Sequence, residues 1–458
     1  MNDNRPMRRG GLAAIAIALL TAGAAQADDA AGDDAILPYE IHQHRLDNGL
    51  NVVTVPFPSP GLAAFYIITR VGARNEVEEG VTGFAHFFEH MMFRGTDKYP
   101  KAAYQAALKS TGAAANANTS QDRTEYHMTG SADKLELMFE LEADRFQNLN
   151  YSEHDFKTEA GAVKGEYTKN FASPYQQLYE KRLETAFREH TYGHTTMGYF
   201  DDIVDMPNQY EYSLKFFDRY YRPEYNTILV VGDVTAERVN ALAEKYFGDW
   251  ERGSYVADIP VEPEQIETRT VHLQSDAIPP YLTMSYKGPA FSDEKLDMPA
   301  LDVLSSIVFS PTSDLYKKLV LEEQKVRFMG GGAYDQRDPG LFTVQASLVD
   351  KADMAYVMEE IEKAIEKVRA EGVDAEDLAR TKSNLQYGMA MRLDTPDAIA
   401  GSLSHYIQLT GDPESINRLY ALYDRVDQAE VKRVAAEYLR PERLTIATIS
   451  PDETGVPQ

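Results

Sequence analysis

The sequence predicts an α+β protein made of two homologous halves, each a mostly antiparallel sheet with helices packed on one face. The first observation is an internal repeat, because LKFFDRYYRPEYNTILVVGDV around Pro223 returns as VKRVAAEYLRPERLTIATISP around Pro441. Both copies predict a helix that ends before the proline and a strand that follows it. The second observation is that strand-like runs alternate with long helical patterns such as MAYVMEEIEKAIEKVRAEG.

The repeat divides the chain into four segments. Residues 1–27 are predicted to be a signal peptide, and residues 28–256 form the N-terminal domain. The Pro- and acid-rich stretch ADIPVEPEQIETR, at 257–269, is the predicted linker. Residues 270–458 then form the homologous C-terminal domain.

The export signal is predicted from the first residues. Arg8 and Arg9 precede the apolar run GLAAIAIALL, and AQA offers small residues for cleavage before Asp28. The run is short and rich in alanine for a membrane span, although an uncleaved anchor stays open as an alternative. The arginine pair also leaves twin-arginine export open. We expect a cleaved, periplasmic protein without a stable membrane span.

Charge and cysteine content exclude several functions. The chain has 46 Lys and Arg against 72 Asp and Glu, a formal net charge of −26, which argues against nucleic acid as a partner. Cysteine is absent, so disulfides, thiolate ligands and a cysteine nucleophile are excluded. Any metal ion must therefore be bound by histidine and carboxylate side chains.

The first half begins with a predicted hairpin. In HRLDNGLNVVTV, Asn48 and Gly49 supply the turn between alternating apolar flanks. LAAFYIITRVGA follows as another strand. GFAHFFEHMMFRGT then changes to helical spacing, with apolar residues at Phe84, Phe87 and Phe88. We expect this stretch to be a largely buried helix.

Two histidines and a glutamate in that helix carry the chemistry. His86 and His90 are four residues apart, so both imidazoles lie on one face, and Glu89 lies on the adjoining flank. Such polar groups in an apolar helix need a partner, and a metal ion is one. The order H-x-x-E-H is the inverzincin pattern of zinc peptidases. The alternative is a pair of core-packed histidines with a capping glutamate.

A third ligand must come from elsewhere, because a catalytic zinc usually takes three protein ligands. EAGAVKGEY places Glu159 and Glu166 seven residues apart, two turns along one helix face. Glu166 could reach the metal while Glu159 acts as an outer acid. By itself the pair is also typical of a solvated helix face.

The stretch AAANANTSQDRTEY predicts an unusually bare strand at 114–119. Small side chains let another backbone approach closely, so an extended peptide could add to this strand through main-chain hydrogen bonds. A plain Ala- and Asn-rich loop is the alternative.

Taken together, these blocks resemble peptidase family M16, the family of pitrilysin, insulin-degrading enzyme and the mitochondrial processing peptidase. The similar blocks are, in order, DNGLNVV, GARNEVEEGVTGFAHFFEHMMFRGT, GAAANANTSQDRTEYHM, HTYGHTTMGY and YYRPEYNTILVVGDV. The second half resembles the weaker, metal-free repeat of the family. The resemblance implies one Zn²⁺ per chain, bound by His86, His90 and Glu166.

The resemblance also assigns roles around the metal. Glu89 matches the general base that activates water for attack on a peptide carbonyl, and Glu159 matches a supporting acid near the metal. The position of Asn116 contacts substrate near the scissile bond in the family, and Ala117 lies on the same strand edge.

The second half departs from the family at one point. In complete family sites the metal-free repeat supplies an arginine and, seven residues later, a tyrosine that hold the substrate and the oxyanion. In SDLYKKLVLEEQKVRFMGG these positions hold Val320 and Arg327. Loss of an oxyanion donor typically costs about 100- to 1000-fold in rate. The resemblance therefore implies the zinc-bearing subunit of a heterodimer, whose zinc-free homologue supplies the Arg/Tyr pair as the two chains close like a clamshell.

The expected activity is zinc-dependent endopeptidase cleavage of peptides small enough to enter a closed chamber. Two alternatives remain. One is a self-sufficient homodimer or monomer, and the other is a non-catalytic peptide-binding or scaffold subunit. The intact HFFEH motif argues against the scaffold, because decayed members of the family lose these residues.

Overall fold

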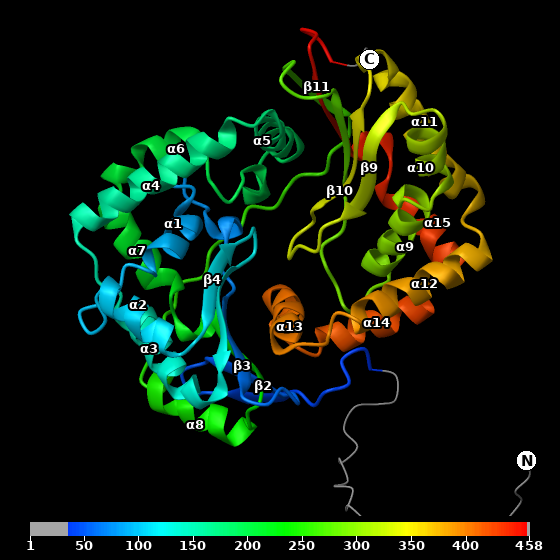
Figure 1. Ribbon diagram of the computed structural model, residues 1–458. Helices are drawn as coiled ribbons and strands as arrows, with labels where there is room; N and C mark the ends of the chain where they lie inside the picture. Colours follow the sequence, from blue (N-terminus) through cyan, green and yellow to red (C-terminus); the bar gives the residue numbers. More distant parts are fainter. Residues whose placement is uncertain (1–34, 456–458) are drawn as a thin grey trace, which may run out of the picture.

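The computed structural model describes residues 35–455, so the predicted signal peptide at 1–27 lies outside the described residues. Two sheets face each other, and each carries most of its helices on the side away from the other sheet (Figure 1). This is the two-half α+β architecture expected from the sequence. Within the described range, no helix combines the length and apolar character needed to cross a membrane.

The first sheet has six strands in the order β1-β2-β6-β3-β5-β4. They are β1 (His42–Arg45), β2 (Asn51–Pro56), β6 (Asn226–Gly232), β3 (Leu62–Thr69), β5 (Thr124–Ser131) and β4 (Ala114–Thr119). Only β2 and β6 are parallel, and the other neighbours are antiparallel. The predicted hairpin between β1 and β2 is confirmed, with Gly49 at a φ of 94° in the turn.

Helices cover the outer face of this sheet. They are α1 (Phe84–Met91), α2 (Lys101–Ser110), α3 (Leu135–Asn148), α4 (Glu153–Phe171), α6 (Phe200–Asp205), α7 (Tyr210–Tyr220) and α8 (Ala236–Phe247). As expected, α1 is largely buried, because Phe84, Phe87 and Phe88 all lie in the core beneath it. Phe88 stacks on Phe216 of α7 with ring centroids 5.3 Å apart.

The second sheet repeats this topology with five strands in the order β7-β11-β8-β10-β9. The strands are β7 (Arg269–Gln274), β11 (Leu444–Ser450), β8 (Tyr281–Lys287), β10 (Leu341–Leu348) and β9 (Val326–Ala333). Strand β11 is parallel to β7 and antiparallel to β8, as β6 is parallel to β2 and antiparallel to β3. The outer helices are α9 (Asp297–Phe309), α10 (Asp314–Tyr316), α11 (Met354–Glu371), α12 (Ala375–Ala390), α14 (Ser415–Arg425) and α15 (Gln428–Tyr438).

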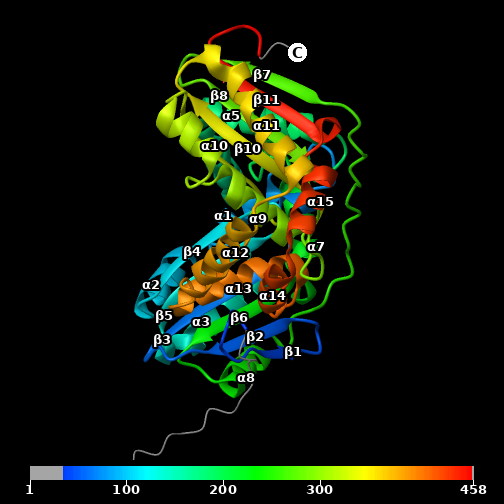
Figure 2. The same cartoon turned by 90° about the vertical axis from the view of Figure 1, so that its right-hand side faces the viewer.

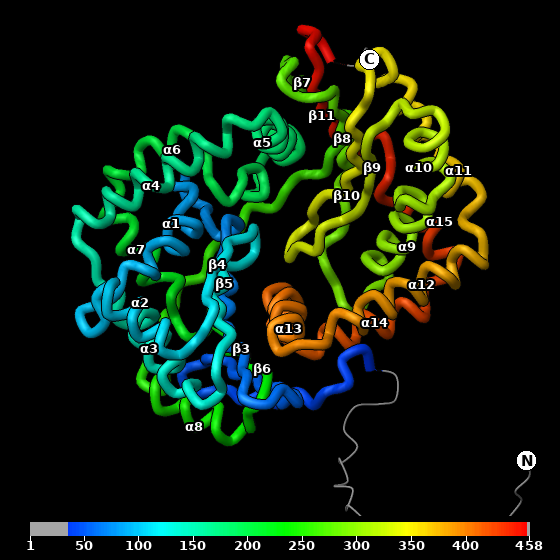
Figure 3. The backbone as a smooth tube through the Cα atoms, in the orientation of Figure 1, coloured from blue at the N-terminus to red at the C-terminus, as the bar shows by residue number. Residues whose placement is uncertain are grey.

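One helix from each half crosses to the sheet of the other half. Helix α5 (Pro174–Ala186) packs against β7 and β11, and α13 (Pro396–Thr410) packs against β3 and β6. Figure 3 shows both helices between the two sheets. Tyr66 of β3 donates to Asp397 Oδ1 of α13 at 2.9 Å. The two halves are therefore intertwined in space, although they are consecutive in the sequence.

The connection between the halves runs along the outside of the molecule without helix or strand until β7 begins at Arg269 (Figure 2). The predicted linker lies in this stretch. Its Glu262 carboxylate accepts the backbone N–H groups of Arg188 at 2.9 Å, Glu189 at 3.0 Å and His190 at 3.1 Å. The linker is thus attached to the first half.

Candidate metal centre

The start of α1 is held by a buried carboxylate. Glu76 accepts the backbone N–H of Gly83 at 2.8 Å and of Ala85 at 2.7 Å, which satisfies donors that the first turn of a helix leaves free. Burial raises the pKa of Glu76 to about 8, and these hydrogen bonds oppose the rise. Gly83 has a φ of 88°, and a Cβ there would lie 2.5 Å from Ile203. The chain therefore enters α1 in one defined direction.

Helices α1 and α4 bring three predicted ligands together. His86, His90 and Glu166 each offer one ligand atom, and these atoms all lie within 4.8 Å of one another. The Glu166 Oε2 is 3.4 Å from His90 Nε2 and 3.8 Å from His86 Nε2. His86 is buried, whereas the Glu166 side chain is 40% exposed. The cluster is thus buried on the side of His86 and exposed to solvent on the side of Glu166.

Glu159 orients one of these histidines. Its Oε1 lies 3.0 Å from His90 Nδ1, so the opposite ring nitrogen, Nε2, is the one directed at the cluster. Its Oε2 pairs with Arg94. A carboxylate behind a histidine in this way is the usual support of a metal ligand. Two imidazole nitrogens and one carboxylate oxygen are also the donor set of a catalytic zinc site. The residues present therefore fit a zinc ion.

Burial and the contacts among the neighbouring side chains shift the pKa values of the residues in and beside the cluster. Burial and, to a smaller extent, the neighbouring His90 together lower the pKa of His86 to about 4, which favours the neutral imidazole that a metal ligand needs. The hydrogen bond to Glu159 raises the pKa of His90. Burial works against ionisation of Glu159, but its bonds with His90 and Arg94 outweigh burial and lower its pKa.

Glu89 lies beside the cluster and is held by the first sheet. Its Oε2 accepts a hydrogen bond from Thr119 Oγ1 at 2.6 Å, at the end of β4. Burial raises the pKa of Glu89, and the bond from Thr119 partly offsets this. The role of Thr119 could not be predicted from the sequence, because nothing in the pattern of one chain shows which strand end meets α1. Arg94 could have been predicted to lie near the cluster, because it follows His90 by four residues.

The bare stretch at 114–119 is a strand and not a loop. Strand β4 lies at the edge of the first sheet, where β5 is the one strand of residues 35–455 that pairs with it. Asn116 is exposed, whereas Ala117 is 7% exposed and belongs to the core. An added peptide would therefore meet the Asn116 side chain but only the backbone of Ala117.

The positions that depart from the family lie in the second half. Val320 sits in a π-helical turn at Lys317–Glu322 and packs against the core of that half. Arg327 is exposed on β9, where its Nε donates to the Leu348 carbonyl at 3.4 Å. The glycine run at 330–332 is part of β9, which is the edge strand of the second sheet.

Together, an H-x-x-E-H helix, a glutamate from a second helix and a repeated α+β fold define the class of inverzincin-type metal sites. Family models agree. The model described as "Insulinase (Peptidase family M16)" matches residues 57–199, and the one described as "Peptidase M16 inactive domain" matches residues 209–385. The chain belongs to peptidase family M16.

Several known proteins are similar over most of the chain. Zinc protease PqqE of Helicobacter pylori is 28% identical over 89% of this chain and 92% of its own length. A probable mitochondrial-processing peptidase subunit beta of Arabidopsis thaliana is 26% identical over 89% of this chain and 77% of its own. The crystal structure of a protease from Helicobacter pylori matches with a TM-score of 0.84 and 28% identity, covering 90% of this chain and 100% of that one.

A more distant structure shares the fold alone. The periplasmic protease PqqL from Escherichia coli matches with a TM-score of 0.73 at 17% identity. The match covers 91% of this chain but 48% of PqqL. One chain of the present protein thus corresponds in fold to about half of that larger one.

Proposed function

We propose that the chain is a zinc-dependent endopeptidase that cleaves peptides. One observation carries the proposal: three ligand atoms from His86, His90 and Glu166 lie within 4.8 Å of one another, and the carboxylate of Glu89 stands beside them. The name of the relative from Helicobacter pylori, a zinc protease, supports the same reaction class.

Three residues of the chain have separate roles in the proposed hydrolysis. Zinc, when bound, lowers the pKa of water toward neutrality and polarises a carbonyl group. Glu89 takes a proton from the attacking water and later gives it to the leaving amine. Thr119 holds Oε2 of Glu89, so the carboxylate is oriented through one oxygen while the other is left for the proton. Glu159 keeps His90 in the orientation that a ligand needs.

The edge of β4 is the proposed binding site for the peptide backbone. The peptide adds beside β4 as a further strand, and main-chain hydrogen bonds give affinity that depends little on sequence. Because Thr119 ends this strand and bonds to Glu89, a peptide on β4 runs toward the base. Asn116 is the exposed side chain on the way.

We further propose that the active form is a heterodimer with a zinc-free M16 homologue. Val320 and Arg327 cannot replace the expected Arg/Tyr pair. The side chain of Val320 packs against the hydrophobic core of the second half. The match to about half of PqqL fits a larger assembly of two such units. The chain would carry out this role in the periplasm after removal of residues 1–27.

Mixing the mature chain with a zinc-free homologue tests the proposed heterodimer. Zinc content and cleavage of a quenched generic peptide are measured for residues 28–458, alone and with a zinc-free homologue. One zinc per chain and cleavage only after mixing support the split site. Full activity of the isolated chain would support a self-sufficient enzyme. A chain that binds peptide but holds no zinc would instead be a binding or scaffold subunit.

A further inference from the structure

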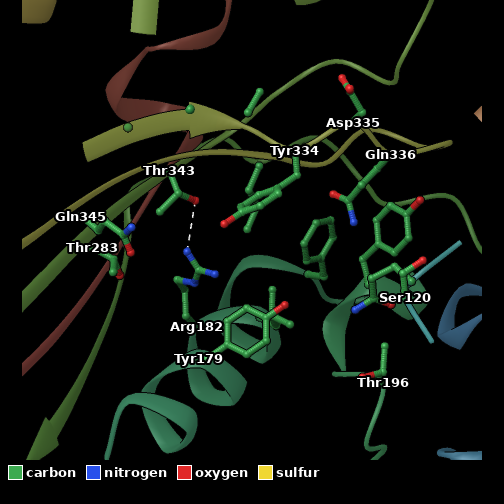
Figure 4. Close-up of a pocket in the computed structure, with 18 of the residues that line it drawn as sticks. Ser120, Tyr179, Arg182, Thr196, Thr283, Tyr334, Asp335, Gln336, Thr343 and Gln345 are labelled. Carbon is green, nitrogen blue, oxygen red and sulfur yellow. Dashed lines mark hydrogen bonds between the residues drawn. The ribbon is translucent and has the colours of Figure 1, made fainter. Parts of the chain in front are cut away.

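A cavity of about 770 Å³ lies between α5 and the inner face of the second sheet. Its wall comes from α5, from β8 to β10, and from the turn after β4 (Figure 4). This size is typical of sites that hold several groups of a ligand. Neither the metal centre nor the β4 edge accounts for it.

Arg182 of α5 is the unusual feature of this cavity. The residue is 9% exposed, and its Nη1 donates to the hydroxyl oxygens of Thr343 at 3.1 Å and Ser285 at 3.3 Å. Its Nε is buried and has no hydrogen-bond partner within the described part of the chain. Across residues 35–455, Arg182 forms no ion pair with a carboxylate, and the ionisable groups that influence it are phenols. A buried cation without a counter-charge is costly unless a ligand supplies one.

The acidic groups that line the cavity are engaged elsewhere. Asp335 lies 2.8 Å from His405 Nε2, within pairing distance. Asp122 accepts from the Tyr192 hydroxyl at 2.8 Å and from the backbone N–H of Arg337 at 3.1 Å. Neither is available to Arg182.

Tyrosine rings complete the surroundings of the guanidinium. Tyr179 lies 5.1 Å from it in a cation–π contact, and Tyr334 and Tyr281 also line the cavity. Figure 4 shows Arg182 rising from the helix toward Thr343, with the Tyr334 ring above the guanidinium and the Tyr179 ring below it in this view. Aromatic walls around one charged fork suit a carboxylate attached to a partly apolar chain.

We propose that this cavity binds a carboxylate of the substrate peptide, from its C-terminus or from an aspartate or glutamate side chain, with Arg182 as its counter-charge. The inference rests on the proposed peptidase function. A peptide is the favoured ligand because the cavity reaches Ser120, the residue after Thr119, at the end of the strand that approaches Glu89. One extended peptide can thus occupy both the β4 edge and this cavity.

Binding of matched peptides tests the proposal. A short fluorescent peptide of Ala, Ser and Tyr is prepared with a free C-terminus, as the amide, and as the amide with one internal Asp. Anisotropy is measured with the full mature chain carrying Glu89→Gln, which prevents cleavage. We expect one or both acid-bearing peptides to bind about 10- to 100-fold more tightly than the amide, as a buried charge-assisted pair predicts. The peptide that gains affinity identifies the source of the carboxylate.

Arg182→Gln in the same background should abolish that preference, whereas Arg380→Gln, on the exposed surface of α12, should keep it. If Arg182→Gln fails to fold, Tyr334→Ala replaces it, because Tyr334 is 70% exposed and its removal leaves the core intact. That variant should reduce the preference by about 2- to 10-fold.

Equal binding of all three peptides, or a preference that survives these changes, would overturn the proposal. The proposed activity is judged separately, by cleavage of the neutral amide peptide by the chain with Glu89 intact and its homologue. A failure of the carboxylate site is therefore distinct from a failure of the peptidase assignment.

Discussion

Replacing Glu159 by glutamine should weaken metal binding without removing a ligand. The Glu159 side chain is 10% exposed and lies 3.0 Å from His90 Nδ1, so its charge is little screened by solvent. A hydrogen bond to a charged group of this kind contributes about 1.5–3 kcal/mol. At about 1.4 kcal/mol for each tenfold change, its loss corresponds to roughly 10- to 150-fold in affinity. Arg94, three residues beyond the end of α1, also loses its charged partner.

Competition with a chromophoric chelator measures this zinc affinity for the mature chain and for Glu159→Gln. Glu153→Gln is the matched control, because Glu153 lies on the same helix but pairs with Lys157 on its exposed side. At saturating zinc the Glu159 variant should recover part of its activity. Unchanged zinc affinity in Glu159→Gln, or an equal loss in Glu153→Gln, would refute the orienting role.

Three further predictions follow from other contacts. Thr119→Val removes the donor to Glu89 and should lower kcat by about 10-fold with little change in KM, while Thr119→Ser should restore it; a loss in KM alone would contradict the contact. Chelation should abolish peptide cleavage, and added zinc should restore it, whereas activity that survives complete zinc removal would exclude the metal centre. The third concerns Asp302, whose pKa is raised from 3.8 to about 7, chiefly by burial and further by Asp335. Between about pH 4 and 7 the folded chain holds a proton that the unfolded chain has lost, so this group's contribution to stability falls as pH rises through that window. Asp302→Asn should therefore raise the melting temperature more at pH 8 than at pH 5, and a gain independent of pH would contradict this reasoning.

Local patterns explain why much of the fold was predictable. The turn at Gly49 and the strand after Pro223 depend on residues close in sequence, and the structure shows both. His86 and His90 meet because helical periodicity alone places them on one face. Glu166 needed the family resemblance, since its helix could equally have faced solvent.

Contacts between elements that are far apart in the sequence could not be predicted from such local patterns. The bond from Thr119 to Glu89 depends on how β4 lies over α1, and the exchange of α5 and α13 depends on how two sheets pack. A hydrophobic helix face shows that a helix is covered but not which sheet covers it. For the same reason the position of Arg182 against the second sheet could not be predicted from the residues around it.

The most direct test of the central claim compares the mature chain with its Glu89→Gln variant, each assayed with the zinc-free homologue. Zinc content per chain and the rate of peptide cleavage are measured on the same samples. We expect one zinc in both proteins, because Glu89 is not a ligand, and a loss of at least about 100-fold in rate in the variant. Equal rates would remove Glu89 as the base, and loss of zinc from the variant would place Glu89 among the ligands.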